Sequence, residues 1–431
     1  DVYNINKDEA KLTWDINDIN IMKKIDTIKD SENEIKKRFG TIYDETLKNY
    51  SLPELKKIYS FFPEPYLITS VWDYKYLKQE KMKIGATDYG FDMEKLFTVN
   101  KDRNNDYTNE FSNRESVVNI LRYYFGYPDK SQHYENQHIV RHRGILPRIK
   151  RICENRCRTM QMKNKPTTQL WFLPYGQQRP IKNVVNALLK IINGEDNMFN
   201  YVKNNYYFFV ALDEKNSPKY DNVVYYNKSS KKSIKDQIIE LEDNIKKGES
   251  IEQNNLIILA GARLQLGISL RNVDIVTLWN NISSTDAIFQ MLFRSMTEVD
   301  STECLEGEYC DNKKFGFMVD LNPQRALTNV FMFKDNLVDK ETRNIDNQYK
   351  VIGDLINIDE DVFMDKYEGD ESKKTEYIKD LFNKLYDSWG NSVDSMKKLT
   401  QKIIKFDQQI LSTISSDLTG VNVSHDRGDK L

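Results

Sequence analysis

Short apolar runs alternate with amphipathic helical stretches through the middle of the sequence. Five of these runs have the length and the β-branched or aromatic content of buried strands, at residues 169–173, 206–212, 256–260, 274–279 and 315–321. Between several of them, apolar residues recur three to four positions apart, as they do on one face of a helix. Alternation of this kind implies right-handed crossover connections. The sequence therefore predicts an α/β fold with a mostly parallel sheet flanked by helices.

A helix that is apolar almost all round is predicted after the fourth run, beginning at a Ser/Thr cap at residues 283–285. Asp286, Gln290 and Arg294 follow at intervals of four and form a single polar stripe. An arginine on a nearly buried helix needs an anionic partner, because an unpaired buried charge is costly. That partner is either a carboxylate, such as Asp286 or Asp320, or a bound ligand.

The carboxyl ends of the predicted strands are the expected ligand positions, because ligands of parallel sheets bind there. In this sequence these ends are residues 174–176, 261–269 and 280–284. An additional apolar run at residues 63–71 predicts one more strand, outside the central region.

The chain divides into three predicted regions. Residues 1–115 form an α-rich N-terminal accessory region, and residues 116–345 form the central lobe that contains the sheet. Residues 346–431 form a helical C-terminal extension, in which two helices meet at Gly390 and a Ser/Asp/Gly-rich tail is loose.

The 431 residues of the chain carry a net charge of only −2. Any basic surface must therefore be confined to a limited part of the chain. One strongly basic block, residues 141–158, sets seven cations against a single acid: Arg141, Arg143, Arg148, Lys150, Arg151, Arg156 and Arg158. The block is either a solvated helix face or a strip that contacts phosphates, since Arg and Lys dominate affinity for nucleic-acid backbones.

Four residues in and beside this block loosely match a zinc-binding pattern: His138, His142, Cys153 and Cys157. A metal among so many arginines is electrostatically unfavourable, so we expect no metal site and keep a zinc protein or metal-dependent nuclease as an alternative. Four cysteines give no disulfide framework, and no apolar run approaches the roughly 20 residues of a membrane helix. These features predict a cytoplasmic protein without a membrane partner.

Several blocks occur in an order that is typical of one protein family: residues 172–176, 258–261, 266–270, 273–276, 290–298 and 316–323. Over about residues 155–360 the chain resembles the second RecA-like lobe of superfamily-2 helicases. More narrowly, it resembles the DEAD/Swi-Snf-like helicases of nucleocytoplasmic large DNA viruses.

The resemblance implies roles for individual residues. Gln290 and Arg294 match the catalytic motif Gln-x-x-Gly-Arg-x-x-Arg, but Phe293 replaces its glycine and Thr297 replaces its second arginine. Arg294 is then the matched candidate to meet the γ-phosphate of ATP. Nucleotide binding is expected at Gly267, Ser269 and Arg294, and nucleic-acid binding at Pro174, Tyr175, Gly176, Arg141, Arg143, Arg156 and Arg158.

The sequence contains no GxxxxGK[ST] phosphate-binding loop. We therefore expect an upstream lobe of the same chain to hold most of the ATP and Mg²⁺, and we expect this fragment alone not to hydrolyse ATP. Together with that lobe, the chain would act as an ATP-dependent helicase or translocase. If the source is viral, we expect it in the host cytoplasm or the virion. The rival interpretation is a non-catalytic RecA-like module that scaffolds a viral transcription or packaging complex.

Overall fold

The computed structural model describes the chain in sections. These are residues 63–73, 77, 86–87, 90–126, 144–156, 167–176, 179–194, 199–213, 217–247, 255–261, 264, 270, 272–297, 315–337 and 345–389.

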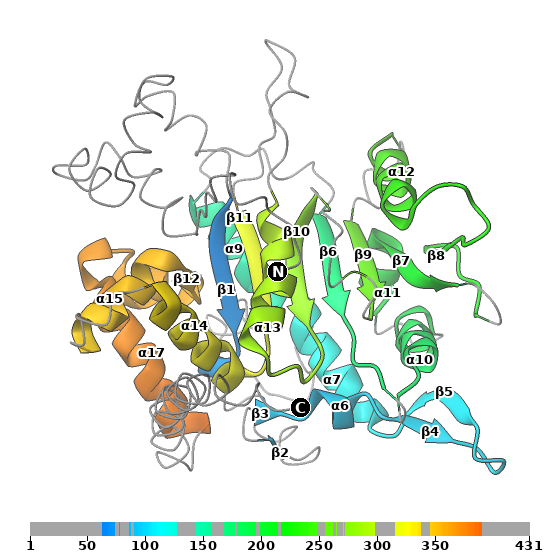
Figure 1. Cartoon of the computed structure of the whole chain (residues 1–431), viewed down its shortest axis with the longest axis horizontal. Coiled ribbons are helices and arrows are strands. Elements are labelled where there is room, and N and C mark those ends of the chain that lie inside the picture. Colours follow the sequence, from blue (N-terminus) through cyan, green and yellow to red (C-terminus); the bar gives the residue numbers. More distant parts are fainter. Residues whose placement is uncertain are drawn as a thin grey trace, which may run out of the picture.

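A parallel sheet of eight strands organises the fold (Figure 1). From edge to edge it contains β12 (Asn357–Ile358), β1 (Glu64–Thr69), β11 (Phe315–Asp320), β10 (Val273–Leu278), β6 (Thr167–Phe172), β9 (Asn255–Ala260), β7 (Tyr206–Asp213) and β8 (Val223–Tyr226). Every neighbouring pair runs parallel. All residues of β10 and β11 are buried, as in sheets covered on both faces. The predicted α/β class and the five predicted strands are confirmed.

Two strands come from the flanks of the central region. The strand predicted at residues 63–71 is present as β1, which pairs with β11 from Glu64 opposite Phe315 to Thr69 opposite Asp320. The short β12 pairs with the other side of β1. The sheet therefore includes residues from both sides of the predicted 116–345 lobe, and the three-region division stays a prediction.

Helices cover both faces of the sheet (Figure 1). On one face lie α13 (Thr285–Leu292), its 3₁₀ continuation η5 (Phe293–Met296) and α14 (Pro323–Leu337). On the other lie α7 (Arg114–Phe125) and α9 (Ile145–Arg156). The β7–β8 half of the sheet is accompanied by α10 (Ile181–Asn193), α11 (Asn200–Asn205) and α12 (Ile234–Lys247).

The remaining elements lie at the β12 edge and at the carboxyl ends of the strands. The β12 edge carries α15 (Ile345–Leu355), α16 (Glu360–Tyr367), η7 (Glu371–Lys373) and α17 (Lys374–Trp389), and η1 (Val71–Asp73) packs against α17. Near the carboxyl ends lie β2 (Ala86–Thr87), β3 (Gly90–Phe91), α6 (Met93–Leu96) and the hairpin of β4 (Val99–Lys101) and β5 (Tyr107–Phe111). Among the described helices, none combines the length and apolar character needed to cross a membrane.

Candidate functional site

The carboxyl end of β10 is covered by the chain itself. The backbone N–H of Met93 donates to Asn281 Oδ1 at 3.0 Å, and Asn281 Nδ2 donates to Asp92 Oδ1 at 2.8 Å. The ring of Phe97 meets Trp279 edge to face, with centroids 5.7 Å apart. Residues 92–97 therefore fill part of the position where the sequence predicted a ligand at residues 280–284.

A buried ion pair fills the adjoining strand end. Arg325 donates from Nε and Nη2 to the two carboxylate oxygens of Asp320, at 2.8 and 2.7 Å. The same guanidinium donates from Nη1 to the carbonyl oxygen of Asn280. Asp320 and Arg325 are both buried. Asp320, considered above as a partner of Arg294, is thus engaged by an arginine from α14.

The predicted polar stripe is present on α13 and η5. Asp286 and Gln290 are exposed, whereas Ile288, Phe289, Met291 and Leu292 are buried against the sheet. Arg294 is half-buried, and this burial lowers the pKa of its guanidinium, because a low-dielectric environment disfavours the charged form. A partly desolvated cation interacts more strongly with an anion than a fully hydrated one does.

Arg294 lies far along the sheet from the carboxyl edge. The helix begins after the end of β10 and runs back, and η5 packs over Gly316 at the start of β11. A Cβ atom at Gly316 would lie 2.6 Å from the carbonyl oxygen of Ser295, so only glycine allows this approach. Arg294 therefore lies away from the carboxyl ends of the strands, where the sequence predicted ligands.

Residues 174–176 do lie at the carboxyl edge, directly after β6. Pro174 is buried, but Tyr175 keeps 42% of its surface exposed and Gly176 is exposed. Gly176 and Arg179 exchange two backbone hydrogen bonds of 3.1 Å, which close the loop, and Arg179 Nη2 donates to Glu94 Oε2 at 2.6 Å. A fixed, exposed aromatic ring at this edge can stack against a base.

Part of the predicted site lies outside the described residues: Gly267, Ser269, Arg141, Arg143, Arg158, His138, His142 and Cys157. The side chain of Arg156 is also outside the description. Where the structure describes the chain, no group of three His, Cys, Asp or Glu side chains is arranged to hold a metal ion.

The described part of the basic block does not form an outward cationic strip. Arg148 is buried and donates from Nε and Nη2 to the carboxylate of Asp361, at 2.8 and 3.0 Å. Arg151 forms an ion pair with Asp365, and Lys150 lies 3.8 Å from Glu154 on the same helix. Asp361 and Asp365 of α16 thus pair with Arg148 and Arg151, which the local sequence could not indicate because these acids lie more than 200 positions away.

Three carboxylates surround the Arg148 guanidinium at the carboxyl end of β1. Asp359 lies 2.7 Å from Nη2 and Asp73 lies 3.5 Å from Nη1, in addition to Asp361. Thr69 donates to Asp359 from its backbone N–H at 2.6 Å and from its hydroxyl at 2.5 Å. Burial is the main cause that raises the pKa of Asp359, to about 6, and the negative charge of Asp361 adds to it.

The raised pKa of Asp359 predicts a pH dependence of stability. The carboxyl takes up a proton on folding between its ordinary pKa of 3.8 and the folded value of about 6. Its contribution is therefore complete below pH 3.8 and is lost as the pH rises through 6, at up to about 1.4 kcal/mol per pH unit. Urea unfolding between these pH values should show this loss in the native protein and in the exposed control Asp387→Asn. Asp359→Asn should lack it, and an unchanged slope in that variant would contradict the assignment.

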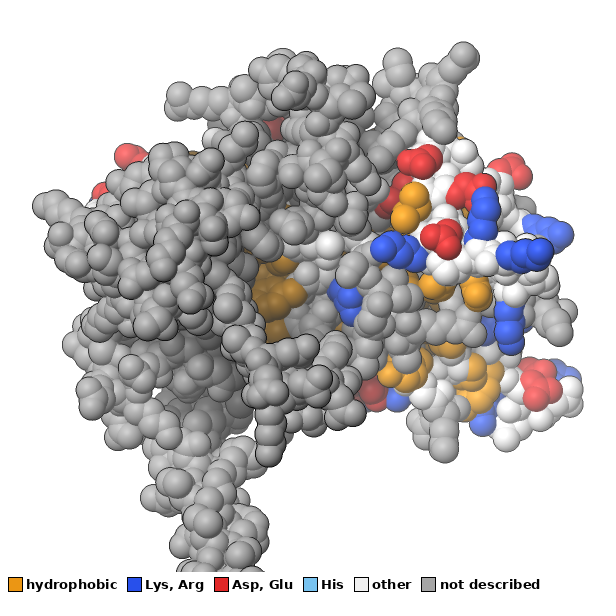
Figure 2. Space-filling view, turned by 45° about the horizontal axis from the view of Figure 1, so that its top comes forward, with side chains coloured by type: hydrophobic (Ala, Val, Ile, Leu, Met, Phe, Trp, Pro, Cys, Tyr) orange, Lys and Arg blue, Asp and Glu red, His pale blue; other side chains and the backbone are white. Residues whose placement is uncertain are grey.

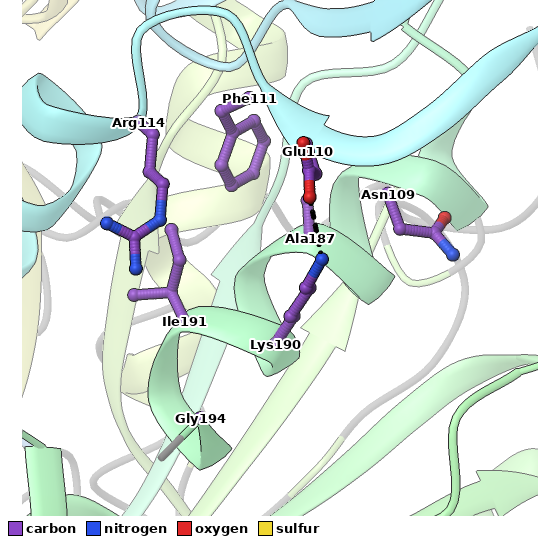
Figure 3. A pocket seen from close by; sticks show the side chains of 8 residues that line it. All are labelled: Asn109, Glu110, Phe111, Arg114, Ala187, Lys190, Ile191 and Gly194. Atoms are coloured by element: carbon purple, nitrogen blue, oxygen red, sulfur yellow. Dashed lines mark hydrogen bonds and ion pairs between the residues drawn. The ribbon is translucent and has the colours of Figure 1, made fainter. Parts of the chain in front are cut away.

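A cavity of about 260 Å³ lies between β5, the start of α7 and the end of α10 (Figure 3). Its lining combines an apolar floor with polar groups: Asn109, Glu110, Phe111, Arg114, Ala187, Lys190, Ile191 and Gly194. Lys190 Nζ lies 2.7 Å from Glu110 Oε1, and this hydrogen bond is the main cause that lowers the pKa of Glu110. Because the lysine is already paired inside the cavity, we assign no ligand to it.

Comparison with known proteins adds little to this description. No protein-family model matches the chain, and no curated protein matches it. Among solved structures, it is similar to a crystal structure of the C-terminal part of the Fun30 ATPase domain, at 12% sequence identity and a TM-score of 0.22. The alignment covers 86% of this chain and 92% of that chain. At so low a TM-score, the assignment of an α/β protein rests on the parallel sheet itself.

Proposed function

We propose that this chain is the second lobe of an ATP-dependent nucleic-acid helicase or translocase of superfamily 2. The observation that carries the proposal is the polar stripe on α13 and η5, where exposed Gln290 leads to half-buried Arg294 on a helix whose apolar face is buried. The strands and helices around the stripe follow one another in the same order as the sequence blocks that resemble this class.

In this proposal the two ends of the sheet have different tasks. Arg294, with Gln290 beside it, meets the phosphates of ATP held by a partner lobe, which also supplies most of the contacts to Mg²⁺. Gly267 and Ser269 complete the nucleotide contacts. The loop of Pro174, Tyr175 and Gly176 binds nucleic acid at the carboxyl edge, on a surface separate from Arg294.

The structure suggests how the chain's own residues contribute. Burial weakens the hydration of the Arg294 guanidinium, so an approaching phosphate gains more from this charge than it would at an open surface. The short 3₁₀ turn of η5 is held against β10 and β11, which fixes the backbone position of Arg294.

A non-catalytic binding module is the second candidate. It is favoured by Thr297, which stands where the motif has a second arginine and whose hydroxyl donates to the carbonyl oxygen of Arg294 at 3.3 Å. A hydroxyl cannot supply the charge of a second arginine.

Nucleic-acid-stimulated ATP hydrolysis by the protein carrying both lobes separates the two candidates. Arg294→Ala should lower the turnover rate on the order of a hundredfold or more, since it removes a charged contact to the reacting phosphates. Arg103→Ala, which removes an exposed arginine from the β4–β5 turn, is the matched control and should retain the native rate. Native-level hydrolysis by Arg294→Ala would refute the role of this arginine. A native protein without ATPase activity would favour the binding module.

A further inference from the structure

A lysine-rich segment connects β8 to the first turn of α12. Residues 227–235 contain four lysines and three serines and no acidic residue, and we call them the lysine segment. Lys228, Lys231 and Lys232 are exposed and Lys235 is half-buried. In a chain of net charge −2, this is a local surplus of positive charge outside the basic block considered above.

The lysine segment has a fixed backbone. Gln237, from α12, donates from Nε2 to the carbonyl oxygens of Asn227 and Lys232, at 3.1 and 3.0 Å. Its Oε1 accepts from the backbone N–H of Asn227 at 2.9 Å. At the helix start, Ser233 and Asp236 cap each other through side-chain and backbone hydrogen bonds. The lysines are therefore presented from a preorganised loop, which reduces the ordering cost of binding.

Few carboxylates neutralise these lysines. Lys232 Nζ lies 2.8 Å from Glu240, and Asp236, which is hydrogen-bonded to Ser233, also interacts with the charges of Lys235 and Lys232. Lys228 and Lys231 make no ion pair with any residue in the part of the chain that the structure describes. Figure 2 shows Lys and Arg side chains interspersed with Asp and Glu side chains over the β8 and α12 end of the molecule.

We propose that the lysine segment binds the phosphate backbone of a single-stranded nucleic acid. The lysines and the hydroxyls of Ser229 and Ser230 offer charge and hydrogen-bond donors to phosphate oxygens without reading bases. The segment follows the carboxyl end of β8, and Tyr175 follows the carboxyl end of β6 in the same parallel sheet. These strand ends are three strand spacings apart, on the order of 15 Å, so one flexible strand can reach both. The proposal rests on the proposed function for the nature of the polymer.

Binding of a fluorescent oligothymidylate, measured without nucleotide over a range of salt concentrations, tests this surface. Replacing Lys228, Lys231, Lys232 and Lys235 together by alanine should make the slope of log affinity against log salt shallower by about 2–3. Affinity at low salt should fall at least tenfold. The matched control replaces four lysines at the opposite end of the molecule by alanine, Lys350, Lys373, Lys379 and Lys384, and should keep the native slope. Gln237→Ala should weaken binding and keep the native slope, because it loosens the loop and removes no charge.

Other outcomes overturn the proposal. A native slope in the quadruple variant would exclude phosphate contacts by the lysine segment, as would equal losses in both quadruple variants. Displacement of the oligothymidylate by polyglutamate at equal charge would indicate an acidic protein partner instead. Failure here would leave the ATPase test of Arg294 unaffected, because binding is measured without ATP.

Discussion

Arg148→Met should lower the free energy of unfolding by about 3–5 kcal/mol, because it leaves buried carboxylates without their cation. The side chain forms two hydrogen bonds with Asp361 and an ion pair with Asp359, and it donates from Nη1 to the carbonyl oxygen of Thr69 at 2.6 Å. Methionine fills a similar volume, so the loss reports on charge and hydrogen bonding more than on packing. Urea unfolding at neutral pH provides the measurement.

Lys150→Ala is the matched control for Arg148. Lys150 lies on the same helix, but its side chain is 75% exposed and 3.8 Å from its nearest carboxylate. An exposed pair of this kind contributes at most about 1 kcal/mol. Equal losses in the two variants would mean that the cluster around Arg148 does not hold α9 and α16 to β1.

Arg325→Met should have an effect of similar size, about 3–5 kcal/mol, by leaving Asp320 uncompensated at the end of β11. The guanidinium also fixes the backbone at Asn280, just before α13 begins. Replacing both partners, as in Asp320→Leu with Arg325→Met, should cost less than Arg325→Met alone, because this site then holds no uncompensated buried charge. Chemical denaturation of the three variants gives the coupling energy.

A larger loss in the double variant than in Arg325→Met would show that the pair is not bound as a unit. The prediction has a functional side as well. Because Arg325 anchors the loop before α13, Arg325→Met should also displace the stripe of Gln290 and Arg294. In the protein carrying both lobes, this displacement would be indicated by an Arg325→Met variant that folds correctly but has lowered ATPase activity.

The sheet could be predicted from the sequence to the extent that strands were long and apolar. β6, β7, β9, β10 and β11 are apolar runs that are mostly buried, so their pattern determined their type. β8 has four residues and β12 has two, and no periodicity can identify elements of that length. The stripe on α13 was predicted for the same reason as the long strands, because helical spacing makes it visible locally.

The cluster around Arg148 could not be predicted, because its members are far apart in the chain. Nothing near Arg148 indicates Asp359 or Asp361, which reach it through the pairing of β12 with β1. The pairing of Asp320 with Arg325 is local, but Asp320 was considered as a partner of Arg294 because the direction of α13 was unknown. The lysine segment was not identified from the sequence, where the denser block at residues 141–158 drew the prediction, and only the bonds of Gln237 reveal it as a fixed loop.

The position of β1 has a consequence for how the chain folds. The Ser70 hydroxyl, directly after β1, donates to the carbonyl oxygen of Leu321, directly after β11. These two residues are 251 positions apart in the sequence. During synthesis, β1 therefore has to wait for nearly the whole sheet to emerge before it can pair. Contacts of such sequence separation form slowly, and until then β11 has an open edge that can pair with other chains. Docking of β1 is thus expected to be the late, aggregation-sensitive step of folding.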